Sequence, residues 1–576
     1  MDQKEDRHAE GTSTGYFSLL YPPGINLDNP SIFFELGPAA QHDLGVDQIA
    51  AAFTADQEQQ REIRKLLSQL LFDPDVISYR QEVVEDLIRN PELVERLASL
   101  FPVIDSLVRF SFHKVKGMNS LHEVTWRIGE LRNIVDCIEE LGKIFSEIEG
   151  RLDSQGFRTL KEEIGNIQND PTYQNLVREL PDLLSKLRTS ASITIGVNLD
   201  SSLRPVQAVL LSVNEEPFTE QSMLNKLFGI RKDHEGIALL HSVPQRAVEG
   251  SYAFPVPSEL GWAVEPMMVP LFSDLAKVLE KTTIPIAKQL RRYTGVQSRL
   301  FTNLRQGLIF YLGAVRFIQR FQIQGLPVCR PRIAPREDRV CEVKESYNVN
   351  LAWRHARTNE QNTLTKNDIN LGRDGRILIL TGPNQGGKTT YMQGAGIVQI
   401  LAQVGCYVPG QQALISPVDN IFTHFPIEEK PESDTGRFGE EAMRLGKIFE
   451  QVTCHSLVLL NETLSSTSFG ESLYLAQDIV RILRRIGNRA IYSTHLHELA
   501  NQVDSLNDSV PGESKIISVV SSPVDIDLLP GGDEINRTYK VENRPPLGQS
   551  YAREIAARYG INYQQLEQIL SERGVF

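Results

Sequence analysis

The stretch ILILTGPNQGGKTT, residues 377–390, decides the fold of this chain. From Gly382 to Thr389 it fits the pattern G-x-x-x-x-G-K-[ST], and the apolar run before it is typical of a buried strand. Apolar side chains from Tyr391 to Val404 recur at helical spacing, so a helix should follow. Strand, glycine-rich turn and helix are what a phosphate-binding loop requires, because backbone N–H groups and the helix N-terminus then surround the phosphates. We predict that the chain binds a nucleoside triphosphate.

Individual roles follow from the chemistry of the loop. Lys388 is expected to reach the β- and γ-phosphates, and the Thr389 hydroxyl is expected to ligate Mg²⁺. The residues expected to hold the nucleotide are Gly382, Pro383, Asn384, Gln385, Gly386, Gly387, Lys388, Thr389 and Thr390. The alternative is a glycine-rich turn that fits the pattern by chance, which the flanking strand and helix disfavour.

Two further strands are predicted downstream, and polar residues follow each of them. Leu457–Leu460 ends on Asn461 and Glu462, where enzymes of this kind hold Mg²⁺ and orient the attacking water. Glu462 is predicted to be the catalytic base, whereas Asn461 places an amide among the metal ligands where a carboxylate is expected. A third strand, from Ala490, should end on His495, a candidate sensor of the γ-phosphate.

Three segments together give a specific resemblance. They are the phosphate loop with its internal Pro-Asn, the sequence VGCYVP at 404–409, and STHLHEL at 493–499. They resemble the ATPase domain of the MutS family of DNA mismatch repair proteins, over roughly residues 330–565. Shorter matches at Arg354-His355, Asn367-Asp368, Tyr539–Val541 and Gly548–Ala552 resemble other elements of the same domain.

Upstream, the pattern predicts helices. LFDPDVISYR at 71–80 looks like the opening of the family's helical core, and apolar spacing predicts one helix face from Ile63 to Leu71. Asn90 and Pro91 should begin another helix, as N-cap and first residue. Longer helices are predicted within 121–138 and 286–321, and β-like segments lie between them at 193–198 and 206–213. The alternative for this part is an ordinary helical domain.

We therefore predict a multidomain fold. An N-terminal segment, 1–47, precedes an α-helical lever and clamp region, 48–327, with a clamp insertion near 190–255. An α/β P-loop ATPase domain of the ABC-type superfamily is expected over 328–576.

Composition limits the compartment and the partners. The five cysteines are scattered without metal-ligand spacing, which indicates reduced thiols and a cytoplasmic protein. The N-terminus is charged and is not followed by an apolar segment, so no secretory signal is expected. No apolar run approaches the length of a membrane span, so no membrane partner is expected.

The resemblance implies ATP and Mg²⁺ as cofactors, DNA as a partner and an ATP-dependent homodimer. The DNA-binding candidates are Arg291, Arg292 and Arg299, on an arm that also carries Arg305, Arg316 and Arg320. A net charge of −13 argues against a protein devoted only to DNA, and a solvated helix face is the alternative reading of this arm.

Several departures from the family narrow the function. The chain before residue 48 is too short for the family's mismatch-reading and connector domains, and no appended nuclease domain is expected. Phe33-Phe34-Glu35 fits the family's Phe-x-Glu, but a local packing cluster is the favoured reading. In the segment that reaches the partner subunit's phosphates, the family's serine is missing, and Arg437 is the candidate in its place.

The leading functional hypothesis is a DNA-associated, slowly hydrolysing ATPase of the mismatch repair or recombination type. It would grip DNA by backbone or shape and would not read mismatches. The alternative is a MutS-like ATPase that moves a protein partner without binding DNA. An ABC transporter subunit fits the Pro-Asn loop and the helical arms poorly.

Overall fold

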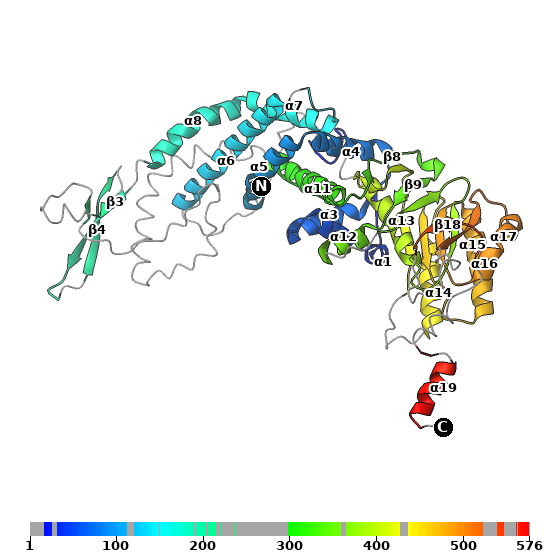
Figure 1. Ribbon diagram of the computed structural model, residues 1–576. Coiled ribbons are helices and arrows are strands. Elements are labelled where there is room, and N and C mark those ends of the chain that lie inside the picture. The colour runs from blue at the N-terminus through cyan, green and yellow to red at the C-terminus, as the bar shows by residue number, and fades with distance from the viewer. Residues whose placement is uncertain are drawn as a thin grey trace, which may run out of the picture.

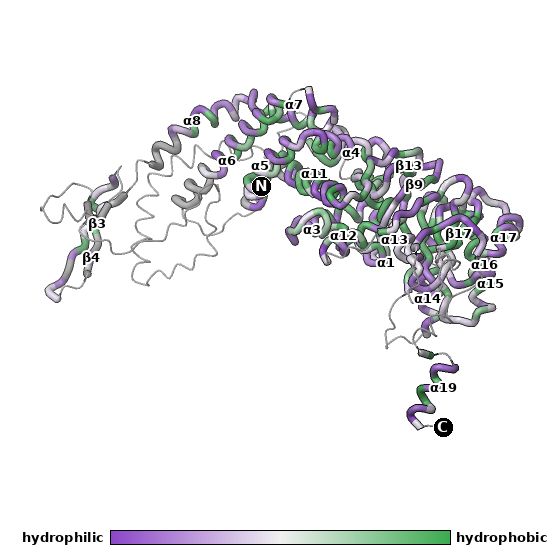
Figure 2. The backbone as a smooth tube through the Cα atoms, viewed as in Figure 1, coloured by the Kyte–Doolittle hydropathy of each residue, from purple (hydrophilic) through white to green (hydrophobic). Residues whose placement is uncertain are grey.

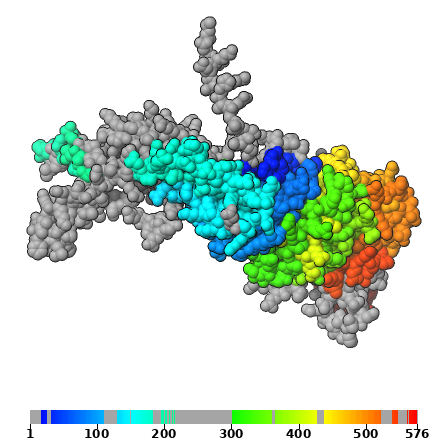
Figure 3. All heavy atoms as spheres, turned by 90° about the horizontal axis from the view of Figure 1, so that it is seen from above, coloured from blue at the N-terminus to red at the C-terminus, as the bar shows by residue number. Residues whose placement is uncertain are grey.

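In a computed structural model of the chain, a helical region leads into an α/β domain, and the two lie end to end (Figure 1, Figure 3). The structure describes residues 17–25, 32–111, 120–148, 150–188, 192–202, 205–214, 219–220, 235–236, 298–358, 364–426, 436–521, 538–546, 560–561 and 563–574. No helix within these ranges is both long and apolar enough to cross a membrane.

The helical region carries a β-hairpin at its far end (Figure 1). Strands β3 (Ser192–Leu199) and β4 (Pro205–Asn214) pair antiparallel, so both predicted β-like segments are present. The helices are α1 (Pro38–Asp43), α2 (Val46–Phe53), α3 (Gln57–Leu67), α4 (Pro74–Arg89), α5 (Pro91–Ser111), α6 (Ser120–Glu147), α7 (Gln155–Asn169), α8 (Pro171–Arg188) and α11 (Ser298–Ile323).

The predicted helix face from Ile63 to Leu71 is wrong in its last turn. Helix α3 ends at Leu67, and Leu70 and Leu71 belong to strand β2 (Gln69–Leu71). This strand pairs antiparallel with β1 (Phe33–Glu35), so a long-range partner overrides the local helical pattern. Phe33-Phe34-Glu35 thus forms strand β1 of this pair, and the Phe34 ring packs 5.4 Å from the ring of Phe72.

Asn90 lies at the predicted helix start, but its side chain does not cap that helix. The Asn90 carbonyl accepts hydrogen bonds from the backbone of Leu93 and Val94 in α5, while its side-chain amide donates backwards to Asp86. The residue thus ends α4 with its side chain and begins α5 with its backbone.

The α/β domain is built on a six-stranded sheet with the order β14-β15-β16-β11-β17-β18. All neighbours are parallel except β18, which is antiparallel to β17. The strands are β11 (Ile377–Thr381), β14 (Ile421–His424), β15 (Leu457–Asn461), β16 (Arg489–Ser493), β17 (Ile516–Ser521) and β18 (Val541–Asn543). The third predicted strand therefore ends at Ser493, two residues before His495.

Both faces of this sheet are buried, as a parallel sheet requires. Leu378, Leu459 and Ile491 share a core with α13 (Lys388–Gln403). Their chain neighbours Ile379, Val458 and Tyr492 point the other way, into a second core. That core is closed by α15 (Phe469–Ile486), α16 (His497–Asn501) and α17 (Val503–Ser509). Figure 2 shows apolar segments concentrated where the sheet meets its covering helices.

A smaller four-stranded sheet lies beside the main one, with the order β10-β9-β13-β8. Its strands are β8 (Arg332–Ile333), β9 (Cys341–Ser346), β10 (Asn367–Leu371) and β13 (Gln412–Ile415). The other short elements are β5 (Thr219–Glu220), β6 (Glu235–Gly236), β7 (Val328–Cys329), the 3-10 turn η2 (Arg336–Asp338), α12 (Val349–Thr358), β12 (Val408–Pro409), α14 (Gly436–Phe449) and α19 (Tyr563–Glu572).

A single apolar core runs from the helical region into the α/β domain, from Phe17 to Val519. The expected boundary between residues 47 and 48 falls inside α2, and that between 327 and 328 falls between α11 and β7. Because α1 and α2 contribute to this shared core, the described residues 17–25 and 32–47 pack with the helical region.

Arg80 of α4 lies fully buried at the junction of the two regions. Its Nε donates to the Leu20 carbonyl at 2.9 Å, and its Nη1 donates to the Val404 carbonyl at 3.2 Å, at the end of α13. Gly405 follows with φ of 83°, and a Cβ there would come within 2.4 Å of the Arg80 Cβ. Glycine therefore allows α4 to approach the end of α13 this closely.

Two arginines of the predicted basic arm have structural roles instead. The Arg305 side chain is only 7% exposed and is paired with Glu58, Glu62 and Asp105 at 2.6 to 3.0 Å. Arg320 donates to the Ala52 carbonyl and stacks over Trp353. Both are committed to packing α11 against neighbouring helices, so neither is available to DNA.

Replacing Arg80 by Met should lower the free energy of unfolding by about 2–4 kcal/mol, because two buried carbonyls lose their donor. Arg89→Met is the matched control in the same helix. Its side chain is 54% exposed and its ion pairs with Glu85 and Asp153 lie at the surface, so a loss below about 1 kcal/mol is expected. Urea denaturation measures both, and equal midpoints for the two variants would contradict the role of Arg80.

Candidate functional site

The glycine-rich turn begins where β11 ends and leads directly into α13. Gly382 has φ of 141°, and a Cβ there would lie 2.7 Å from the Ser521 carbonyl at the end of β17. Any larger residue would be excluded on both grounds. The Ser521 hydroxyl also donates to the Gly386 carbonyl, so β17 supports the turn from the side. The predicted order of strand, turn and helix is therefore present.

Lys388 is folded back onto its own loop. Its Nζ donates to the carbonyls of Gly382 at 2.9 Å and Pro383 at 3.0 Å, and the residue is only 5% exposed. Burial lowers the pKa of Lys388 to about 8, an effect that nearby Glu462 partly opposes. The ammonium group is thus held by two neutral carbonyl oxygens, which a phosphate group can replace.

Thr389 and Asn461 meet at the head of α13. The Thr389 hydroxyl donates to the Asn461 side-chain oxygen at 3.4 Å, so β15 and the phosphate loop place two oxygen atoms side by side. Hydroxyl and amide oxygens suit Mg²⁺, which takes its other ligands from water and phosphate. Among the residues that the structure describes, there is no cluster of three or more His, Cys, Asp or Glu side chains that could hold a metal ion.

Glu462 and His495 form a pair beside this position. The His495 Nε2 lies 3.1 Å from the Glu462 Oε1, and the Glu462 backbone N–H donates to the Ser493 carbonyl at 2.9 Å. The hydrogen bond from His495 holds the pKa of Glu462 below its usual range, and the charge of Lys388 adds to the effect. A carboxylate kept ionised in this way can accept a proton from water.

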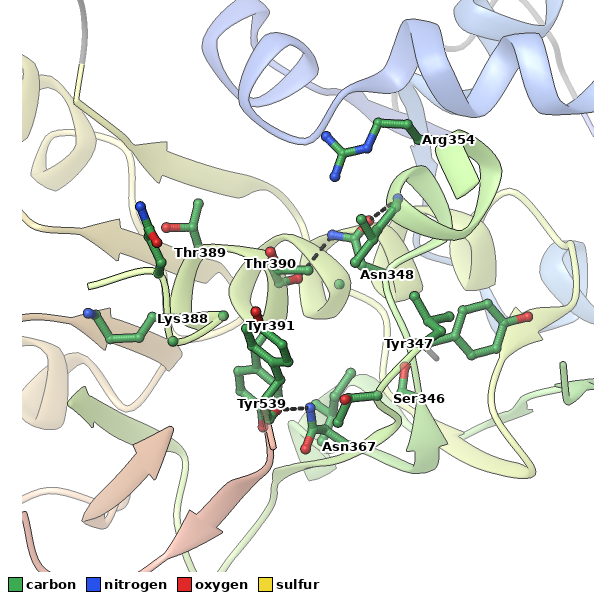
Figure 4. A pocket seen from close by; sticks show the side chains of 18 of the residues that line it. Ser346, Tyr347, Asn348, Arg354, Asn367, Lys388, Thr389, Thr390, Tyr391 and Tyr539 are labelled. Carbon is green, nitrogen blue, oxygen red and sulfur yellow. Dashed lines mark hydrogen bonds between the residues drawn. The ribbon is translucent and has the colours of Figure 1, made fainter. Parts of the chain in front are cut away.

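A cavity of about 770 Å³ opens in front of the turn (Figure 4). Its lining includes Lys388, Thr389 and Glu462. The opposite walls come from residues not predicted as site residues, namely Ser346, Tyr347, Asn348, Arg354, His355, Asn367 and Tyr539. The motif matches at 354–355, 367–368 and 539–541 were the available signal for several of them.

Hydrogen bonds tie these walls to the phosphate loop and to each other. The Asn348 side chain donates to the Thr390 carbonyl at 3.0 Å, which joins α12 to the first turn of α13. The Asn367 side chain donates to the Tyr539 carbonyl at 3.0 Å, and the Tyr539 ring lies beside Gly387. Parts of the chain more than 150 residues apart in sequence thus form one cavity.

Gln385, Gly386, Gly387 and Thr390 of the loop also line the cavity. The candidates for the partner subunit and for DNA lie elsewhere or are not described. Arg437 is exposed in the first turn of α14. Arg291 and Arg292 lie outside the described residues, and Arg299 is described only as part of the backbone of α11. The structure therefore brings together Lys388, Thr389, Asn461, Glu462 and His495, and it leaves the DNA-binding candidates as predictions.

Comparisons with known proteins agree with this arrangement. Residues 378–561 match the model of MutS domain V, and residues 72–324 match that of the MutS2 N-terminal domain.

Similar individual proteins carry the name DNA mismatch repair protein MutS. The one from Shouchella clausii is 37% identical over 149 residues, which is 26% of this chain and 17% of the relative. That of Prochlorococcus marinus is 24% identical over 507 residues, covering 83% of this chain and 53% of the relative. The chain thus spans at most about half the length of these two relatives. Two family models in the expected order, with a relative similar over most of the chain, place this protein in the MutS family.

Proposed function

We propose that this chain binds ATP with Mg²⁺ in the cavity before α13 and hydrolyses it slowly. The observation that carries the proposal is the convergence of Lys388, Thr389, Asn461 and Glu462 at the carboxyl edge of one parallel sheet. Ligands bind at this edge in open α/β folds. The MutS domain V match over the same residues supports the reading.

Each residue has a role consistent with its position. Lys388 exchanges its two carbonyl partners for phosphate oxygens, and Thr389 with Asn461 holds Mg²⁺, which would neutralise phosphate charge. Glu462 accepts the proton of the attacking water, and His495 holds its carboxylate in place. The exposed Tyr539 ring offers a stacking surface for the nucleotide base at the cavity wall.

Asn461 is the reason to expect slow turnover. A neutral amide oxygen attracts a divalent cation less strongly than a carboxylate does. The metal is then less firmly anchored, and the developing charge on the phosphate is less well neutralised. Glu462 remains available as the base, so hydrolysis is slowed but retained.

The relatives' printed names extend the proposal to DNA. We propose a DNA-associated ATPase of the mismatch repair or recombination type, working as an ATP-dependent homodimer in the cytoplasm, with Arg437 facing the partner subunit's nucleotide. The second candidate is an ATPase that acts on a protein partner. The acidic net charge of −13 favours it, as does the absence of Lys and Arg from the sequences of β3 and β4.

Lys388→Ala should abolish ATP hydrolysis and weaken nucleotide binding, because the charge facing the β- and γ-phosphates is lost. Turnover and binding of a fluorescent ATP analogue measure the two effects. Lys143→Ala, an exposed site on α6, is the matched control and should behave as the native protein. Native turnover in Lys388→Ala would rule out this site.

Asn461→Asp should tighten Mg²⁺ binding and raise the hydrolysis rate by about tenfold, the usual scale for a metal-site partner. Mg²⁺ titration of the turnover rate gives both quantities. Asn169→Asp, at the exposed end of α7, adds the same charge far from the site and should change neither. A slower Asn461→Asp enzyme would mean that the amide itself is required.

Binding to DNA should show no preference for single mismatches. We expect mostly electrostatic binding, with a slope of log affinity against log salt of about −0.9 per phosphate contacted. Filter binding on perfect, mismatched and branched duplexes, with and without ATP, measures this. Replacing Arg291, Arg292 and Arg299 by Ala should flatten the slope. A mismatch preference that Phe33→Ala removes would contradict the proposal, and binding to no DNA would favour the protein-partner candidate.

A further inference from the structure

The backbone that carries Glu462 is held in a conformation that it would not adopt by itself. Glu462 has φ of 49° and Leu464 has φ of 66°, so two residues with side chains lie in the left-handed region on either side of Thr463. Each such residue costs on the order of 1 kcal/mol or more. Surrounding contacts must therefore hold the turn that places the carboxylate.

Thr463 is the point at which the neighbouring elements grip this turn. It is 3% exposed, and its hydroxyl lies 3.0 Å from the His424 Nδ1. The Tyr492 hydroxyl donates to its carbonyl at 3.3 Å, from β16. On the far side, the Ser472 hydroxyl donates to the Leu464 carbonyl at 2.7 Å, from α15. Three separate elements, β14, β16 and α15, thus fix the two consecutive residues Thr463 and Leu464.

His424 is placed for this contact by the sheet. It ends the edge strand β14, where it pairs in register with Leu460 of β15, two residues before Glu462. The side chain is almost completely buried, and burial lowers the pKa of His424 to about 4, so the ring is neutral at physiological pH. A neutral imidazole has one donor and one acceptor nitrogen, and either can pair with a hydroxyl.

Helix α14 joins the same arrangement from outside. Its Arg444 donates to the Phe425 carbonyl, next to His424, and its Glu441 accepts from the Ser466 hydroxyl at 2.7 Å. Helix α14, which carries Arg437, is therefore hydrogen-bonded to the end of β14 and to the loop that follows Glu462.

We propose that His424 is a positioning residue for Glu462, acting through its contact with the Thr463 hydroxyl. This inference rests on the proposed ATP hydrolysis, and it identifies His424 as a residue that holds the proposed catalytic base, Glu462, in position. The phosphate loop is supported separately, by Ser521 and by its own carbonyls. Loss of the contact should therefore impair hydrolysis and spare nucleotide binding.

Thr463→Val tests this directly, because valine keeps the shape and removes the hydroxyl. We expect kcat to fall on the order of 10- to 100-fold, the scale of a small misplacement of a catalytic group. The Kd for ADP should stay within about twofold of the native value, since binding energy and transition-state alignment are separable. Thr463→Ser, which restores the hydroxyl, should recover most of the rate.

The matched control is the same threonine-to-valine change at Thr423, which precedes His424 on β14. Thr423 is also buried on β14, but its hydroxyl donates to Asp43 at 2.7 Å, on the opposite face of the sheet from His424. Thr423→Val loses a comparable hydrogen bond and should keep native kcat. A rate loss in both variants, in proportion to lost stability, would show that the His424–Thr463 pair serves folding alone.

A second pair of variants covers the case in which Thr463→Val fails to fold. His424→Leu should lower kcat, while His424→Asn keeps a polar group near the Nδ1 position and should retain more of it. The double variant with Thr463→Val should be no slower than the slower single variant, because both remove one interaction.

Native kcat in Thr463→Val and His424→Leu would overturn the positioning role and leave the proposed function standing. A native protein that binds no nucleotide would overturn the proposed function. One that binds nucleotide without turnover would overturn the role of Glu462, and with it this inference.

Discussion

The parallel pairing of β16 with β15 on one side and with β11 on the other aligns the ends of three strands at one edge of the sheet. Gly382, Glu462 and His495 all lie just beyond these ends, so the backbone ladder sets their spacing before any side chain is considered. Because both faces of the sheet are buried, a slip by one residue would move core side chains to the wrong face. The chemistry of the site is thus fixed by the same register that stabilises the core.

Sequence patterns predicted the parts of this structure that depend on local order. The phosphate loop, the strands around it and the long helices each carry their signal within a short window. Leu70 and Leu71 could not be assigned this way, because the strand that pairs with them lies over 30 residues earlier. Arg305 likewise belongs to a basic helix face when only its own helix is considered. The carboxylates that pair with it come from α3 and α5, which lie far away in the sequence. The cavity wall at Tyr539 depends on tertiary contacts that no local window contains.

Helix α13 connects the two regions electrostatically as well as sterically. Its first turn faces the cavity, where exposed N–H groups favour negative charge. At its other end, the C-cap residue Val404 accepts a hydrogen bond through its carbonyl from the buried guanidinium of Arg80, a cation at the negative end of the helix. The interior of this helix is buried on nearly all sides, so it behaves as a stiff connection between the phosphate loop and α4.

The shared apolar core has a consequence for how such a chain can change over generations. Residues from α1, α2, α11 and α13 belong to one apolar cluster that extends from the helical region into the α/β domain. Core volume is conserved only if neighbouring side chains change together. A substitution on α2 therefore constrains which side chains are tolerated on α12 of the α/β domain, which packs against it. The helical region and the α/β domain are therefore expected to change together in evolution. Replacing either region by that of a distant relative would create a poorly matched interface between them.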